Sequence, residues 1–138
     1  MSSPKDKTKL IIPQGCNNAP KKQVVIDFTV GIIMKQIEVI KEYADESIIW
    51  YQLKEGKKVQ GQCSMLTTLQ EENNKAVDSL EIDQVITHGK LASINGVISL
   101  ANDIEVEFCD VYVFSSAARS GKVKEIKSYR IESLCKRF

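Results

Sequence analysis

The sequence is poor in the side chains that most often hold metals or form nucleophile–base pairs. Its 138 residues include one histidine, His88, and four cysteines that stand far apart and form no CxxC pair. The sequence therefore offers few ligands for a zinc site, and it has only one histidine that could activate a cysteine nucleophile. We therefore expect no metal and no cofactor. We also expect free thiols rather than disulfides, since nothing else in the sequence points outside the cell.

Net charge and long apolar runs are scarce as well. The formal net charge of +1 at pH 7 gives no bulk attraction to nucleic acid or to an anionic membrane. No apolar run reaches about 18 residues, the length of a transmembrane helix, and the start MSSPKDKTKL lacks the pattern of a secretory signal. These absences predict a cytoplasmic protein without nucleic-acid or membrane partners. A hydrophobic content of 43% suits a domain with its own core.

The first half of the sequence carries helical patterns behind a polar start. Residues 1–20 are predicted to form a mobile N-terminal arm; the alternative is that its apolar residues 10–12 pack on the domain. A helix is expected to begin near Asn18-Ala-Pro20, where a polar cap precedes a proline in the first turn. Apolar residues at helical spacing then continue, in two successive helices rather than one. A strand over residues 47–53 and a third helix after Gly61 are predicted to follow.

From residue 76 onward, nearly all of the sequence predicts sheet. Alternation places the even-numbered residues of 80–86 on one face of a strand, and Thr87-His-Gly-Lys90 is a hairpin turn signal. Further strands are predicted over residues 91–100, 104–115 and 122–134. Helices followed by an antiparallel meander indicate the α+β class, and we expect a single domain over residues 21–138.

A carboxylate stands in the middle of the most strand-like run, EVEFCDVYVF at residues 105–114. Because side chains alternate across a strand, Asp110 shares one face with apolar and aromatic side chains. These are Val106, Phe108, Tyr112 and Phe114. The opposite face is also apolar in its second half, so we expect the helices to cover one face and a second subunit the other.

Two hypotheses for Asp110 remain open, because a buried carboxylate costs free energy unless it is paired, hydrogen-bonded or protonated. In the first, Asp110 pairs with a lysine of a neighbouring strand, such as Lys127, or lies in water at the rim of a cavity. In the second, apolar surroundings raise its pKa, and the protonated acid donates a hydrogen bond to a ligand oxygen.

Several motifs in a fixed order carry a resemblance to a known family. They are YADESIIW at 43–50, the glycine at 61, VITHGKLASINGVI at 85–98, and FCDVYVF followed by GKVKEIKSYRI at 121–131. In their order and spacing, over about residues 20–134, the sequence resembles the nuclear transport factor 2-like superfamily, especially its small SnoaL-like and ketosteroid isomerase-like bacterial members. The resemblance implies a cystatin-like α+β barrel, a cone-shaped curved antiparallel sheet wrapped over three N-terminal helices, with a pocket at its mouth. It also implies a homodimer joined through the sheet.

The resemblance assigns site residues as well. Asp110 falls where ketosteroid isomerase keeps a protonated aspartic acid in its oxyanion hole, which makes Asp110 the candidate catalytic residue. Phe28 falls at the position of that enzyme's oxyanion tyrosine, and Tyr51, give or take one residue, at the position of its catalytic base. Neither side chain suits that role, since phenylalanine cannot donate a hydrogen bond and a phenol is a poor base at neutral pH. The Asp-Arg-Asp arrangement of the epoxide hydrolases is not found.

The aromatic side chains near Asp110 are the candidate ligand-binding residues. They are Phe28, Trp50, Tyr51, Phe108 and Tyr112. Trp50 and Tyr51 must point to opposite sides of their strand, so only one of them can line a pocket, and the resemblance favours Tyr51. His88 stands in a hairpin turn, which indicates a turn residue rather than a catalytic group.

Three functions are compatible with these residues. The first is a small-molecule binding domain whose apolar pocket contains one acid, Asp110, and takes a small apolar molecule with one polar oxygen. The second is an isomerase, dehydratase or cyclase acting on a small ketone or a polyketide-like substrate, with Asp110 as hydrogen-bond donor. The third is a protein-interaction domain with a filled pocket. We expect the first, because one acid among aromatics suits binding at least as well as catalysis.

Overall fold

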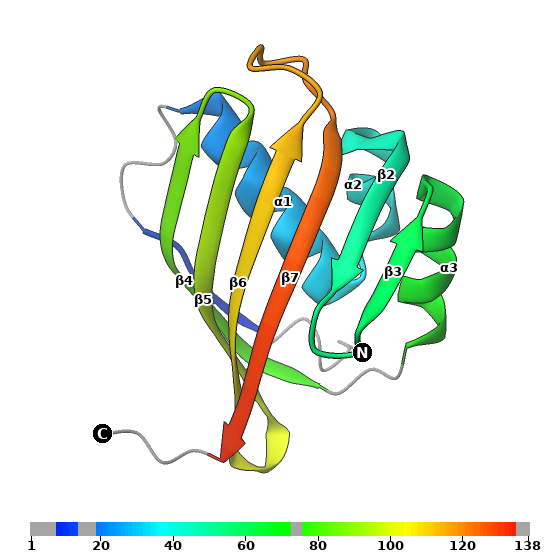
Figure 1. Ribbon diagram of the computed structural model, residues 1–138. Helices are drawn as coiled ribbons and strands as arrows, with labels where there is room; N and C mark the ends of the chain where they lie inside the picture. The colour runs from blue at the N-terminus through cyan, green and yellow to red at the C-terminus, as the bar shows by residue number, and fades with distance from the viewer. Residues whose placement is uncertain (1–7, 14–18, 73–75, 135–138) are drawn as a thin grey trace.

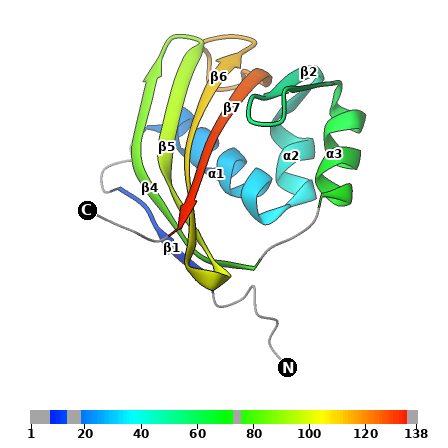
Figure 2. The ribbon, with the colours of Figure 1, turned by 60° about the horizontal axis from the view of Figure 1, so that its bottom comes forward.

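Three helices pack on one face of a curved sheet in the computed structural model, which describes residues 8–13, 19–72 and 76–134 (Figures 1 and 2). The helices are α1 (Pro20–Met34), α2 (Ile37–Tyr43) and α3 (Gln62–Glu71). Pro20 occupies the first turn of α1, as the sequence predicted, and the helix ends at Lys35, whose φ of 59° is left-handed. The predicted pair of successive helices and the third helix after Gly61 are confirmed.

In the described part of the chain, the sheet has seven strands in the order β1-β4-β5-β6-β7-β2-β3. Their bounds are β1 (Lys9–Ile11), β2 (Ala44–Gln52), β3 (Lys57–Gln60), β4 (Val77–His88), β5 (Leu91–Leu100), β6 (Ile104–Phe114) and β7 (Val123–Leu134). Strands β4 to β7 form the predicted antiparallel meander, with Gly89 and Lys90 in the first hairpin turn. The predicted α+β cone is confirmed.

Two pairings depart from the expected antiparallel sheet. Strand β2 pairs in parallel with β7, and β1 pairs in parallel with β4. Each of these pairings joins strands that are separated along the chain by helices, the kind of long connection that parallel neighbours require. The sheet is therefore mixed, and it ends in the edge strands β1 and β3 without closing into a barrel.

Part of the predicted mobile arm is a strand. In β1, Leu10 lies opposite Leu80 of β4, and the Thr8 hydroxyl donates a hydrogen bond to the Val77 carbonyl oxygen at 2.8 Å. The prediction of a mobile arm is thus wrong for residues 9–11, because the open edge of β4 offers backbone groups that a short extended segment can pair. Residues 1–7 and 14–18 of that arm lie outside the described residues.

The alternation predicted for β4 fails in its second half. The register between β4 and β5 shifts between Ile82 and Gln84. Leu80 and Ile82 face the core as expected, but after the shift Val85 is buried and Ile86 is exposed. An extra residue in one strand exchanges the faces of all that follow, which a pattern of alternating residues cannot show.

The core lies between the helices and the inner face of the sheet. The predicted inner face of β6 is confirmed, since Phe108, Asp110, Tyr112 and Phe114 are all buried. Phe28 of α1 meets the Tyr112 ring edge-on at 6.0 Å between centroids. Among the described residues, no helix has both the length and the apolar character needed to cross a membrane.

Candidate functional site

A cavity of about 470 Å³ is lined by residues from the ends of α1 and α3 and from the turn between β2 and β3. Figure 1 shows that these three parts of the chain lie at the same end of the molecule. One side of it is aliphatic and comes from α1 and from the inner face of β4, β5 and β6. The residues of this side are Ile32, Ile33, Val77, Ile98, Leu100 and Val106. The other side is polar and comes from β2, the turn after it, the start of β3, β7 and the ends of α1 and α3. Its residues are Lys35, Trp50, Gln52, Glu55, Lys57, Glu72, Ser128 and Arg130.

Asp110 is held by a network of side chains rather than by a cavity. Its side chain has no exposed surface, and Arg130 on β7 donates from Nη1 to Oδ1 at 2.5 Å and from Nη2 to Oδ2 at 3.4 Å. Ser128 lies directly opposite Asp110 across β6 and β7, and its hydroxyl group acts to lower the pKa of the carboxyl group. The Trp50 indole donates to the Ser128 hydroxyl oxygen at 3.0 Å. Trp50, Ser128 and Arg130 line the cavity, and Asp110 lies behind them.

This network answers the question of why an acid stands in β6. The partner of Asp110 is neither Lys127, which lies opposite Val111 with its side chain exposed, nor water at a cavity rim. Burial raises the pKa of Asp110, while the Arg130 guanidinium and the Ser128 hydroxyl act in the opposite direction. Since arginine stays protonated, the carboxylate fixes a cation at the cavity wall. Arg130 can therefore donate to a ligand from this part of the cavity wall, with Asp110 as its support.

Trp50, not Tyr51, lines the cavity. Trp50 is buried on the inner face of β2. Tyr51 follows it in the strand and therefore lies on the outer face, where the Lys58 and Lys127 ammonium groups are each 5.9 Å from its ring centroid. The preference for Tyr51 as the pocket residue is therefore wrong, because the strand register differs by one residue from the one that the resemblance suggested.

The three other predicted aromatic residues belong to the core behind the cavity. Phe28 and Tyr112 are fully buried, and neither is among the described residues that line the cavity. The Tyr112 hydroxyl lies 2.6 Å from the Thr29 hydroxyl, and burial raises the pKa of Tyr112 well above its ordinary value. Phe108 is buried beside the ion pair, with the Arg130 guanidinium carbon 5.4 Å from its ring centroid. Phe108 thus packs against the cation site, whereas Phe28 and Tyr112 pack in the core.

Polar residues that the sequence patterns did not single out complete the cavity. The Gln52 amide nitrogen donates to Glu72 Oε2 at 2.7 Å, and Lys35 Nζ donates to Glu72 Oε1 at 3.2 Å and to the Leu69 carbonyl oxygen at 3.0 Å. The arginine of the network could have been found from strand parity alone. Residues 126, 128 and 130 share one face of β7, and the apolar Ile126 marks that face as the inner one. No local sequence pattern predicts the contact between Glu72 and Gln52.

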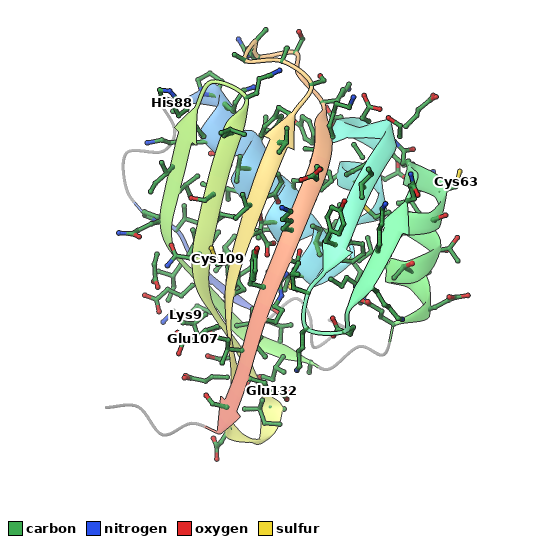
Figure 3. The ribbon with its side chains drawn as sticks, viewed as in Figure 1. Lys9, Cys63, His88, Glu107, Cys109 and Glu132 are labelled. Atoms are coloured by element: carbon green, nitrogen blue, oxygen red, sulfur yellow. The ribbon has the colours of Figure 1, made fainter. Side chains whose placement is uncertain are left out.

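The histidine and the described cysteines lie apart from the cavity. Figure 3 shows His88 at the end of the β4–β5 hairpin, Cys63 on α3 and Cys109 on the sheet, far from one another. Both of these cysteines are free, as predicted; Cys16 and Cys135 lie outside the described residues. Within the described ranges, no three histidine, cysteine or acidic side chains come close enough to hold a metal ion.

The arrangement of helices and sheet is that of the nuclear transport factor 2-like fold. No protein-family model matches this sequence, and no curated protein matches it either. Solved structures that resemble it include a nuclear transport factor 2-like protein of unknown function from Burkholderia xenovorans. That structure has a TM-score of 0.66 and 13% sequence identity, over 84% of this chain and 86% of the other.

Two further similar structures carry names that suggest enzymes. A candidate SnoaL-like polyketide cyclase from Shewanella denitrificans has a TM-score of 0.68 and 14% identity, covering 82% of this chain and 91% of the other. A candidate ketosteroid isomerase from Kribbella flavida has a TM-score of 0.67 and 11% identity, covering 83% and 79%. At these identities the similarity shows the fold, which agrees with the resemblance found in the sequence. The fold is one that ligand-binding and enzyme-type domains share.

Proposed function

We propose that this chain binds a small organic molecule in the cavity, with Arg130 as its polar anchor. The observation that carries the proposal is the Asp110–Arg130 pair, which holds a guanidinium at the wall of a cavity of about 470 Å³. Three described hydrogen bonds, two to Asp110 and one to the Tyr129 carbonyl oxygen, use three of the five N–H groups of Arg130. Two donors are left for an acceptor oxygen of a ligand.

The aliphatic side of the cavity favours a ligand with an apolar body. Small-molecule sites commonly combine apolar walls with a few placed polar groups, and this cavity lies within their usual range of size. A carboxylate or a carbonyl oxygen suits Arg130, because both accept from a guanidinium. The open cavity argues against a protein-interaction domain with a filled pocket.

The fluorescence of Trp50 provides the test, since it is the only tryptophan of the chain and it lines the cavity. Octanoic acid, 2-octanone and octylamine share an apolar chain and differ in their polar end. We expect the acid and the ketone to change the emission saturably and the amine to have no effect, because an ammonium group cannot accept a hydrogen bond from Arg130. Equal binding of all three, or of none, would contradict the proposal.

Variants then assign the anchor. The double variant Asp110→Asn/Arg130→Gln removes both charges of the pair without leaving either one buried alone, and it should abolish binding of the acid. Lys127→Gln is the matched control, because it removes a cation from the outer face of the same strand. Unchanged binding by the double variant would exclude Arg130 as the anchor.

An enzyme of the isomerase, dehydratase or cyclase type is the second candidate. The observation that favours it is that Glu72, Lys35 and Arg130 converge on one cavity, since an enzyme needs more than one polar group there. Proton NMR of each bound ketone or acid after long incubation separates the two functions. Recovery of unchanged ligand supports binding, whereas a product whose formation is lost in Glu72→Gln supports catalysis.

We also propose that the outer face of the sheet joins two copies of the chain. Large apolar side chains are exposed on this face, with Ile86, Tyr129 and Ile131 at 59%, 43% and 70%. Burying such a surface stabilises a dimer. Light scattering should give twice the 15.5 kDa chain mass, and Ile131→Lys should give the monomer. Leu53→Lys, at an exposed leucine in the turn after β2, should leave the dimer intact; a monomeric parent chain would refute the interface.

A further inference from the structure

Gln52 carries an acceptor atom that the described part of the protein leaves without a partner. The residue is 7% exposed and lines the cavity from the inner face of β2, where its Cα pairs with that of Ser128. Its Nε2 group donates to Glu72, but Oε1 is buried and accepts no hydrogen bond from any described atom. Buried polar atoms in proteins are almost always paired, so an orphan at a cavity wall points to a missing partner.

The direction of the Gln52 amide follows from its neighbours. A carboxylate only accepts hydrogen bonds, so the NH₂ group of the amide must face Glu72 and the carbonyl oxygen must face away from it. Glu72 is itself held, because its second oxygen accepts from Lys35 at 3.2 Å and Lys35 also donates to the Leu69 carbonyl at the end of α3. This arrangement directs the NH₂ group of Gln52 to Glu72 and leaves the carbonyl oxygen as the unpaired acceptor.

We infer that Oε1 of Gln52 is a second polar subsite, which accepts a hydrogen bond from a hydroxyl group of the ligand that Arg130 anchors. This inference rests on the proposed function and adds the ligand class to it. Arg130 supplies donors and Gln52 supplies an unpaired acceptor, so the two subsites together suit a molecule that has both an acceptor oxygen and a hydroxyl group. Hydroxylated carboxylic acids with an apolar chain meet both demands.

The register limits how far apart the two groups stand on the ligand. Gln52 is paired with Ser128, and Arg130 follows Ser128 by two residues on the same face of β7. Two residues of a strand span about 7 Å, which long side chains readily bridge. The hydroxyl group therefore belongs within a few bonds of the carboxylate.

The experiment compares octanoic acid with 2-, 3- and 5-hydroxyoctanoic acid by titration of Trp50 fluorescence. At least one hydroxy acid should bind about tenfold more tightly than octanoic acid, because its hydroxyl group pairs a buried acceptor that would otherwise stay unpaired. Gln52→Met keeps the length of the side chain and removes the acceptor, so the preference should vanish in this variant. Gln70→Met on the exposed surface of α3 should keep it.

The outcomes separate this inference from the proposed function. If octanoic acid binds through Arg130 but no hydroxy acid binds more tightly, the subsite is refuted and the anchor stands. A preference that persists in Gln52→Met refutes the subsite equally. If none of the four acids binds, both proposals fall. If no hydroxy acid binds more tightly than octanoic acid to the unmodified protein, the subsite is refuted even where Gln52→Met does not fold.

Discussion

Replacing Arg130 by glutamine should destabilise the protein in a way that depends on pH. The substitution removes the cation that lies 2.5 Å from a carboxylate with no exposed surface. Removing one partner of a buried ion pair costs roughly 3–5 kcal/mol, since the other charge remains buried without compensation. The Arg130 side chain is 17% exposed, so water reaches part of it, and we expect the lower end of this range, about 3 kcal/mol at pH 7.

The pH dependence follows from the protonation of Asp110. Burial raises its pKa in the folded protein, so the folded state binds more protons than the unfolded state. The contribution of Asp110 to the unfolding free energy is then greatest below the pKa of the unfolded state, about 3.9 for aspartate. This contribution falls as the pH rises through the folded-state pKa. Loss of Arg130 raises that pKa further. The difference between the parent protein and Arg130→Gln should therefore be small near pH 4 and grow toward pH 7, by at most 1.36 kcal/mol per pH unit.

Urea unfolding followed by Trp50 emission, at several pH values between 4 and 7.5, measures this difference. The double variant Asp110→Asn/Arg130→Gln is the control, because it retains no carboxyl group at this position. The difference in stability between Arg130→Gln and this double variant therefore isolates the titration of the unpaired Asp110. A deficit of Arg130→Gln that is constant over the range, or that grows toward acid pH, would show that the unpaired Asp110 charge is not its cause.

Two further substitutions test the packing behind the cavity. Tyr112→Phe leaves the buried Thr29 hydroxyl without its partner at 2.6 Å and should cost about 1–2 kcal/mol of unfolding free energy. Adding Thr29→Val removes the unpaired hydroxyl group and should recover much of this loss. A larger loss in the double variant would contradict this reasoning. Gly96→Ala places a Cβ 2.0 Å from the Glu81 carbonyl oxygen of β4 and should cost about 3 kcal/mol or more by thermal unfolding. Gly56→Ala meets open space and should cost only about 1–2 kcal/mol for its left-handed backbone, so equal losses at both glycines would refute the close contact.

Much of the fold could be predicted because it depends on local patterns. Pro20 marks the start of α1, and the alternation in β6 identifies the inner face that contains Asp110. The hairpin between His88 and Leu91 follows from its turn residues. Each of these features is decided by neighbours within a few residues, so the sequence contains all the information that is needed.

The rest depends on residues that meet only in the folded chain. No pattern near Leu10 predicts its pairing with β4. The register shift after Ile82 exchanges the two faces of β4, and no local pattern predicts this shift either. Likewise, β2 reaches β7 across the helices and the meander, which brings Trp50 to Ser128. Such contacts are chosen by the free energy of the whole packed sheet, which a pattern along one segment does not contain.

The candidate site shows the same division. By itself, the sequence determined that an acid stands among aromatic side chains on the inner face of a strand, and hence that the acid needs a partner or a proton. Only the tertiary structure decided between them. It brings Arg130 from the neighbouring strand to Asp110 and leaves Gln52 beside the same cavity with an unpaired oxygen. The physical reason is that a buried charge takes whichever partner the register of adjacent strands provides, and that register is set by long-range packing.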